Sequence, residues 1–144
     1  MIKTRFLSIL LSFGFLTTPF APQNVQSCTS VIVSRGASAD GSVMVSYTYD
    51  VAGFVQPLYF YPGGTYEPGD SLRVYGYHEE NYLGTIHQVP RTFRVIGNMN
   101  ERQVAIAETT FTGRTELHGG NGFLDYGNLI RITLQRASSA REAI

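Results

Sequence analysis

The residue with the greatest chemical capacity in this sequence is Cys28, the only cysteine of the chain. A single cysteine cannot form a disulfide within its own chain. The thiol is therefore buried and inert, paired with another chain, lipid-modified, or reactive. A reactive thiol needs a base close to the sulfur, and the residues that precede Cys28 indicate how the chain could supply one.

The first 27 residues have the features of a secretory leader. Lys3 and Arg5 are followed by an almost unbroken apolar run at 6–16. This run is shorter than the roughly 20 residues that span a bilayer, and it fits the apolar region of a signal peptide. The alternative is a buried N-terminal helix. Small residues at Val25 and Ser27 favour cleavage after Ser27, which predicts an exported protein in a periplasmic, extracellular or cell-surface location.

Cleavage after Ser27 would place an α-amine on the same residue as the thiol of Cys28. An α-amine has a pKa of about 7.7–8.0 in model peptides, so part of it is neutral at physiological pH. It can take the thiol proton and later return a proton to a leaving nitrogen, without a separate histidine. One extra residue before Cys28 would convert the amine into an amide and remove this base.

After Thr29 the sequence predicts short strands separated by turns. Nine Tyr, nine Phe and fifteen Gly favour a β-rich chain. Asp40-Gly41 is a hairpin signal between the first two strands, and Pro68-Gly69-Asp70 is a turn. The expected strands lie at 29–34, 43–49, 54–61, 71–77, 83–89, 92–97 and 103–110.

The period of the apolar residues changes from Phe123 onward and predicts a helix packed on the sheet. Asp125 is expected to cap this helix or to lie in its first turn. Ser138 or Ser139 is expected to cap a second helix, which the end of the sequence interrupts. Strands followed by helices predict an α+β fold, and the interrupted helix indicates a fragment of a longer domain.

Three segments resemble one family of enzymes. The run 28–45 (CTSVIVSRGASADGSVMV) resembles the start of the C69 dipeptidases, which are N-terminal nucleophile (Ntn) hydrolases related to choloylglycine hydrolase and penicillin V acylase. Segments 98–111 (NMNERQVAIAETTF) and 125–144 resemble the second signature of the family and the helix that follows it. The resemblance implies an αββα sandwich, of which 28–144 would be the N-terminal part, and hydrolysis of dipeptides through a cysteine acyl-enzyme.

The resemblance also implies roles for individual residues. Cys28 matches the nucleophile, and Asp50, the second catalytic candidate, matches the Asp that follows the second strand. The Asp50 carboxylate could orient the α-ammonium group or a substrate amine, and the alternative is that this residue simply opens a turn. Many members carry an Arg three residues before that Asp, where this sequence has Tyr47, so the binding of an amine or substrate carboxylate differs there. A tyrosine hydroxyl can still donate a hydrogen bond.

A second group of candidates lies in segment 98–111. Asn100 and Glu101 match the Asn-Glu pair that opens a strand of the family. Thr110 stands where the acylase relatives carry an Asn that stabilises the oxyanion, and its hydroxyl or backbone N–H could contribute there. We therefore take Tyr47, Asn100 and Thr110 as candidates for contacts with the substrate or the oxyanion.

Two other functions remain open for Cys28. Residues 25–28 (VQSC) partly resemble a lipobox, in which Cys28 would be lipidated and the protein would have a binding or structural role. A related amide hydrolase of the choloylglycine or penicillin V acylase type is the other alternative. The isolated fragment is expected to show little or no activity because its sheet would be incompletely covered.

Composition and the remaining motifs exclude several function classes. The formal net charge is zero and the pI is about 6.8, which argues against a nucleic-acid surface. His78, His87 and His118 lack the spacing of metal ligands. The resemblance implies dipeptide substrates. The sequence predicts no cofactor, no metal and no membrane span after processing, and it leaves the oligomeric state open.

Overall fold

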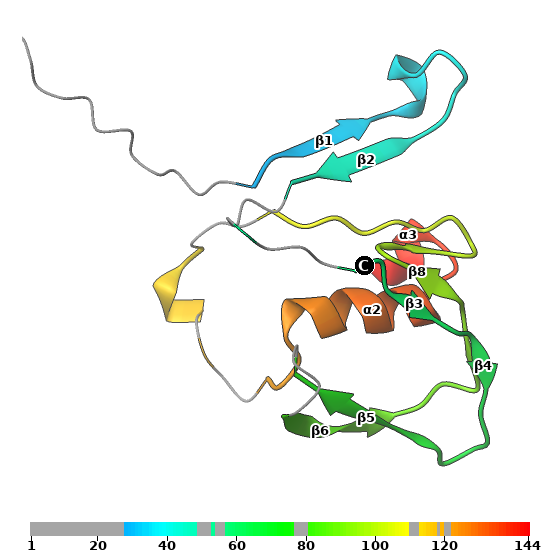
Figure 1. Cartoon of the computed structure of the whole chain (residues 1–144), viewed down its shortest axis with the longest axis vertical. Helices are drawn as coiled ribbons and strands as arrows, with labels where there is room; N and C mark the ends of the chain where they lie inside the picture. The colour runs from blue at the N-terminus through cyan, green and yellow to red at the C-terminus, as the bar shows by residue number, and fades with distance from the viewer. Residues whose placement is uncertain are drawn as a thin grey trace, which may run out of the picture.

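The computed structural model describes residues 28–48, 53, 57–76, 81–109, 113–117, 119 and 122–144. Within these ranges the chain combines small antiparallel sheets with α-helices (Figure 1). The expected α+β class is confirmed at this level. The expected leader over residues 1–27 and the start of the expected strand at 54–61 lie outside the described residues.

The first two strands form a hairpin, as expected. β1 (Ser30–Val33) pairs with β2 (Met44–Tyr47) in antiparallel register, with Ser30 opposite Tyr47. The connection contains a short 3-10 helix, η1 (Arg35–Ala37). Asp40 closes this connection, because its Oδ1 atom accepts hydrogen bonds from the Ser38 hydroxyl at 2.6 Å and the Ser42 N–H at 2.9 Å. These hydrogen bonds hold the pKa of the Asp40 carboxyl well below its usual range.

A second, much longer hairpin follows, and it consists of short paired pieces. Three strands on the outgoing arm pair with three on the returning arm in reverse order (Figure 1). The pairs are β3 (Phe60–Tyr61) with β8 (Val95–Ile96), β4 (Gly64–Thr65) with β7 (Arg91–Thr92), and β5 (Ser71–Tyr75) with β6 (Tyr82–His87). The expected strands at 71–77 and 83–89 correspond to β5 and β6, whereas the strand expected at 92–97 is divided among β7, β8 and the residues between them.

The long hairpin bends where its two arms differ in length. Between Thr65↔Arg91 and Ser71↔His87, the outgoing arm has the five residues 66–70 and the returning arm has the three residues 88–90. The longer arm closes on itself: the Asp70 N–H donates to the Glu67 carbonyl, and the Glu67 N–H donates to Asp70 Oδ2 at 2.8 Å. Gly69 adopts a φ of 97°, which favours glycine.

The strand expected at 103–110 does not form as a continuous strand. β9 (Met99–Asn100) pairs with β8, and a tight turn follows in which the Asn100 N–H donates to the Val104 carbonyl. Gln103 has a φ of 63°, which is incompatible with a strand. An isolated bridge between Met99 and Ala105 is the β-pairing that remains in the described part of this segment.

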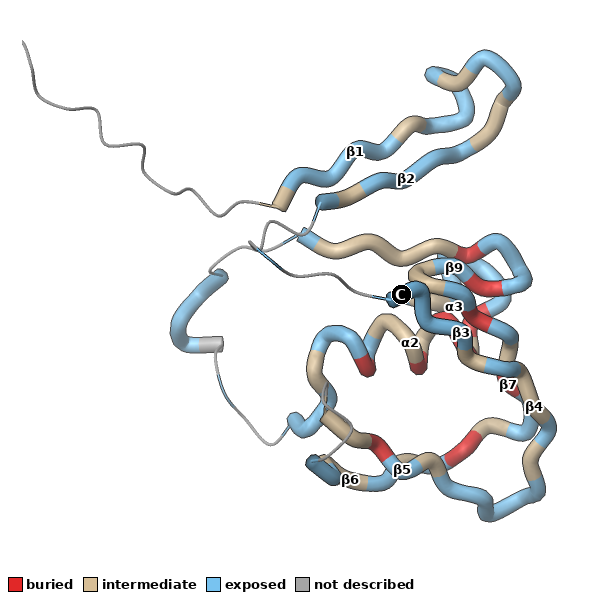
Figure 2. Tube along the Cα trace, in the orientation of Figure 1, coloured by how far each residue is buried: buried red, intermediate tan, exposed pale blue. Residues whose placement is uncertain are grey.

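The main helix packs against two strands of the long hairpin, β7 and β8, and against β9. α2 (Tyr126–Arg136) begins at Asp125, whose Oδ1 accepts from the Asn128 N–H at 2.7 Å. The helix contacts β7, β8 and β9, and its Leu134 forms a core cluster with Val95 and Val104. Figure 2 shows buried segments on α2 and on the strands beside it.

A short helix completes the described chain. α3 (Ala140–Ala143) begins at Ser139, whose hydroxyl oxygen accepts from the Glu142 N–H at 3.2 Å. Of the two serines expected as caps, Ser139 therefore takes the N-cap position. The Ser138 hydroxyl instead donates to the Glu142 carboxylate at 2.6 Å.

The β1–β2 hairpin contrasts with this packed region because most of it is exposed (Figure 2). Its apolar side chains are accessible to solvent over both strands. The exposed members are Val31, Ile32, Val43, Met44 and Val45. The hairpin therefore contributes little to the core.

Candidate active site

Cys28 lies two residues before the start of β1 and is half-buried. The pairing of β1 with β2 extends toward it by one residue on each strand. The Thr48 N–H donates to the Thr29 carbonyl at 2.9 Å, and the Thr29 N–H donates to the Thr48 hydroxyl at 3.0 Å. These hydrogen bonds fix the backbone next to the thiol, so Cys28 occupies a defined position at the end of a sheet.

Tyr47 lies on the same face of the hairpin as Ser30. Directly opposed residues of an antiparallel pair share a face, and residues two apart on one strand share a face. Since Ser30 is opposite Tyr47, continuing the alternation along β1 places Cys28 on this face as well. The structure thus brings together two of the residues that the sequence identified, Cys28 and Tyr47.

The surroundings of Tyr47 raise the pKa of its phenol. Burial is the main cause that raises its pKa, and the negative charges of Glu108 and Cys28 raise it further. A hydrogen bond with the Asn98 side chain acts in the opposite direction. A neutral phenol can donate a hydrogen bond at neutral pH, and it can do so to an oxygen on which negative charge develops.

Asn98 and Glu108 are site residues that the sequence reasoning missed. The Asn98 Nδ2 atom donates to the Ile106 carbonyl at 2.8 Å, and the Ile106 N–H donates back to the Asn98 carbonyl at 3.1 Å. The Ser30 hydroxyl donates to the Glu108 carbonyl at 3.0 Å. Both residues belong to the segment 98–111 that resembles a family signature, and this resemblance was the one signal for them.

Asn100 has a different surrounding from the other candidates. It is buried, and its Nδ2 atom donates to the carbonyls of Leu134 at 2.7 Å and Ala137 at 2.8 Å. Its Oδ1 atom accepts from the N–H groups of Arg102 and Val104, both at 3.0 Å. Four hydrogen bonds use both donors and both lone pairs of the amide, so Asn100 joins the turn after β9 to the end of α2.

Glu101 is engaged with a neighbouring arginine. The Arg94 guanidinium donates to Glu101 Oε2 from Nε at 2.8 Å, and its Nη2 atom lies 2.7 Å from the same oxygen. The Arg94 N–H also donates to Oε1 at 3.2 Å. These hydrogen bonds lower the pKa of the Glu101 carboxyl. Glu101 therefore stays ionised and shapes the turn.

Two further candidates, Asp50 and Thr110, lie outside the described residues. The role of Asp50 beside the amine stays a prediction from the sequence, and the role of Thr110 at the oxyanion stays a prediction from the resemblance.

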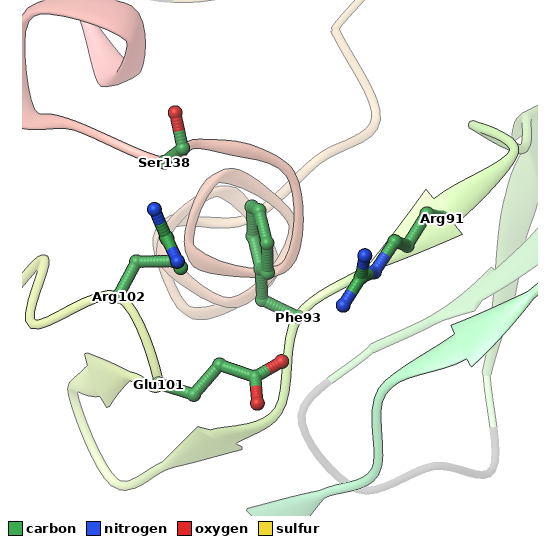
Figure 3. Close-up of a pocket in the computed structure, with 5 residues that line it drawn as sticks. All are labelled: Arg91, Phe93, Glu101, Arg102 and Ser138. Atoms are coloured by element: carbon green, nitrogen blue, oxygen red, sulfur yellow. The ribbon is translucent and has the colours of Figure 1, made fainter.

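A shallow concavity of about 370 Å³ lies on another part of the surface. Figure 3 shows its lining, in which the Phe93 ring stands between the side chains of Arg91 and Arg102, with Glu101 below and Ser138 above. The Glu101 carboxylate is paired with Arg94, and the Ser138 hydroxyl is paired with Glu142. Neither Cys28 nor Tyr47 lines this concavity.

Among the described residues, no group of three or more His, Cys, Asp or Glu side chains is arranged to hold a metal ion. Among the same residues, no helix has the length and apolar character needed to cross a bilayer.

Comparison of the chain with protein-family models, with curated proteins and with solved structures found no match.

Proposed function

We propose that this chain belongs to an exported cysteine dipeptidase of the Ntn class, with Cys28 as the nucleophile and an αββα sandwich as the complete fold. The observation that carries the proposal is the position of Cys28, half-buried next to β1, with Tyr47 on the paired strand acting electrostatically with it. The mixed α+β architecture is compatible with the proposed sandwich.

In the proposed reaction the α-amine of processed Cys28 takes the proton of its own thiol. The sulfur then forms a bond to the carbonyl carbon of the dipeptide, and the carbonyl oxygen becomes an oxyanion. The ammonium group returns its proton to the leaving nitrogen as the C–N bond breaks. A water molecule, deprotonated by the same amine, attacks the thioester and releases the acid and the thiol.

Tyr47 has a defined part in this scheme. A tyrosine hydroxyl is protonated at neutral pH, and the raised pKa of Tyr47 extends that range to higher pH. It can therefore donate a hydrogen bond to the oxyanion or to a substrate carboxylate without a charge of its own. Removal of one donor of this kind typically costs about a hundred- to a thousandfold in turnover. We therefore expect Tyr47→Phe to reduce kcat by up to that factor while leaving Cys28 alkylation intact.

The decisive experiment separates the thiol from the amine. Cys28→Ala should abolish hydrolysis of unblocked dipeptides. A processed variant with one alanine added before Cys28 keeps the thiol but turns its amine into an amide, so it should lose about a hundred- to ten thousandfold in kcat. Wild-type activity should rise with pH through the titration of an α-amine, near about 7.7–8.0 before any local shift.

Two results would contradict this proposal. The first is an alanine-extended variant as active as the wild type, because the amine could not then be the base. The second is a mature N-terminal mass that shows a residue before Cys28 or a diacylglyceryl thioether on it, which would favour the lipoprotein alternative. In that case Cys28→Ser should release the protein from membranes.

A further inference from the structure

Glu108 reaches the candidate site through the segment that follows β9. This segment runs from β9 toward the open end of the β1–β2 hairpin (yellow in Figure 1). The paired hydrogen bonds between Asn98 and Ile106 hold it in place, and the hydrogen bond from the Ser30 hydroxyl to the Glu108 carbonyl fixes it against β1. Glu108 is therefore bound to the residue that lies two positions from Cys28.

The charges around Tyr47 have one sign. In the part of the chain that the structure describes, the Glu108 carboxylate is the charged side chain that acts most strongly on this phenol, and Cys28 has a smaller effect in the same direction. Glu108 itself is half-buried, and partial exclusion of water strengthens its interaction with a cation. The face that carries the proposed nucleophile thus presents the negative charge of the Glu108 carboxylate.

A dipeptide brings a positive group to this face. Its α-ammonium is attached to the carbon next to the scissile carbonyl, so it must lie within a few ångströms of the sulfur during attack. N-acylated substrates lack this charge, and an anionic acyl group would be repelled by a carboxylate.

We propose that the Glu108 carboxylate binds the α-ammonium group of the substrate and so selects dipeptides with an unblocked amino terminus over N-acylated amides. This inference rests on the proposed function, and it assigns the specificity of that site to one side chain.

The test compares an unblocked dipeptide with its N-acetylated form in the mature full-length protein. Glu108→Gln keeps the size of the side chain and removes its charge. Hydrogen bonds to charged groups contribute about 1.5–3 kcal/mol, which corresponds to about ten- to a hundredfold. We expect this loss in kcat/KM for the unblocked dipeptide, mainly through KM, and an unchanged kcat/KM for the N-acetylated form. The exposed residue Glu67 provides the control, because Glu67→Gln should change neither value.

The other outcomes are equally informative. An equal loss for both substrates, with a displaced pH profile, would mean that Glu108 acts on the amine of Cys28, and it would overturn the inference. Unchanged selectivity between the unblocked and the N-acetylated dipeptide would also overturn the inference. If the wild type hydrolyses neither substrate, the proposed function fails. Calorimetric titration of Cys28→Ala with the unblocked dipeptide then decides this inference separately, since Glu108→Gln should weaken binding, and equal or absent binding rejects it.

Discussion

At the scale of single residues, Asn100 shows most clearly how a sequence candidate acquires its role. Its amide groups bond to backbone atoms of the turn after β9 and of the C-terminal end of α2. The two helix carbonyls belong to Leu134 and Ala137, 34 and 37 positions away in the chain. No local pattern around Asn100 indicates such distant partners, whereas the Asp125 cap could be predicted because its partner is three residues away.

Replacement of Asn100 should therefore destabilise the fold. Asn100→Ala leaves buried backbone donors and acceptors without partners, and each such group costs about 1–3 kcal/mol. We expect a loss of at least about 2 kcal/mol in the free energy of unfolding, measured with urea. Asn81→Ala is the control, because this side chain is exposed and should change the free energy little. Equal midpoints of urea unfolding for the two variants would contradict the structural role of Asn100.

The ion pair of Glu101 predicts a pH dependence. Its pKa in the folded protein lies below the unfolded value because Arg94 donates to its carboxylate. A lowered pKa means that the stabilising contribution is present above the unfolded value, about 4.3, and is lost as the pH falls through the folded value.

The substitution Glu101→Gln tests the direction in which stability changes with pH. The wild type should be more stable than the variant at pH 7, and the difference should shrink as the pH falls below about 4.3, because protonated Glu101 resembles glutamine. Urea midpoints measured from pH 7 to pH 2 would show it. A difference that stays constant or grows in acid would contradict the assignment. The pair is exposed on the Arg94 side, with 66% of that side chain accessible, so the effect should be modest.

At the scale of elements, the long hairpin has features that could be predicted from the sequence and others that could not. Pro68-Gly69-Asp70 predicted a turn, and the chain does turn there. The sequence could not show that this turn makes one arm longer than the other, because that depends on which residues pair across the sheet. For the same reason, the strand expected at 92–97 was divided into β7 and β8 at Phe93, whose N–H donates to the Gln135 carbonyl of α2 instead.

Gly63 marks a close approach of the two arms just before β4. A Cβ atom at this position would lie 2.7 Å from the Thr92 carbonyl oxygen and 3.1 Å from the Arg94 nitrogen. Since both atoms belong to backbone, they cannot move aside as a side chain would. Gly63→Ala should destabilise the protein by about 1–3 kcal/mol, in the range of overpacking.

Gly36→Ala is the matched control, because its added Cβ meets nothing within 4 Å and its φ is not positive. This substitution should be neutral or slightly stabilising. Thermal unfolding of both variants gives the comparison. A Gly63→Ala variant as stable as Gly36→Ala would show that the arms separate more easily than their pairing indicates.

At the scale of the whole molecule, burial is unevenly distributed. Leu134, Val74 and Val95 are almost completely buried, whereas the apolar side chains of the β1–β2 hairpin remain accessible. The α+β class could be predicted from the order of strand and helix patterns. The distribution of burial could not, because an alternating run such as 29–34 indicates which residues share a face and not what covers that face.

Exposed apolar side chains predict binding of hydrophobic dyes and self-association. Ile32 is 73% accessible at the middle of β1. Ile32→Ser should reduce fluorescence of a hydrophobic dye and lower the sedimentation-detected association, with little change in the unfolding midpoint. Val74→Ser provides the contrast: Val74 is fully buried, so the substitution should lower the midpoint. An Ile32→Ser variant that unfolds as readily as Val74→Ser would show that the hairpin is packed in solution.

The four hydrogen bonds of Asn100 have a consequence for motion. Because one carboxamide serves both the turn and the end of α2, fraying of the helix and opening of the turn become a single event. Amide protons of Val104 and Ala137, whose N–H groups donate to Asn100 Oδ1 and to the Thr133 carbonyl, should exchange with deuterium at a common rate set by that event. The last turn of the helix and the segment that leads to Glu108 would then exchange their amide protons at the same rate.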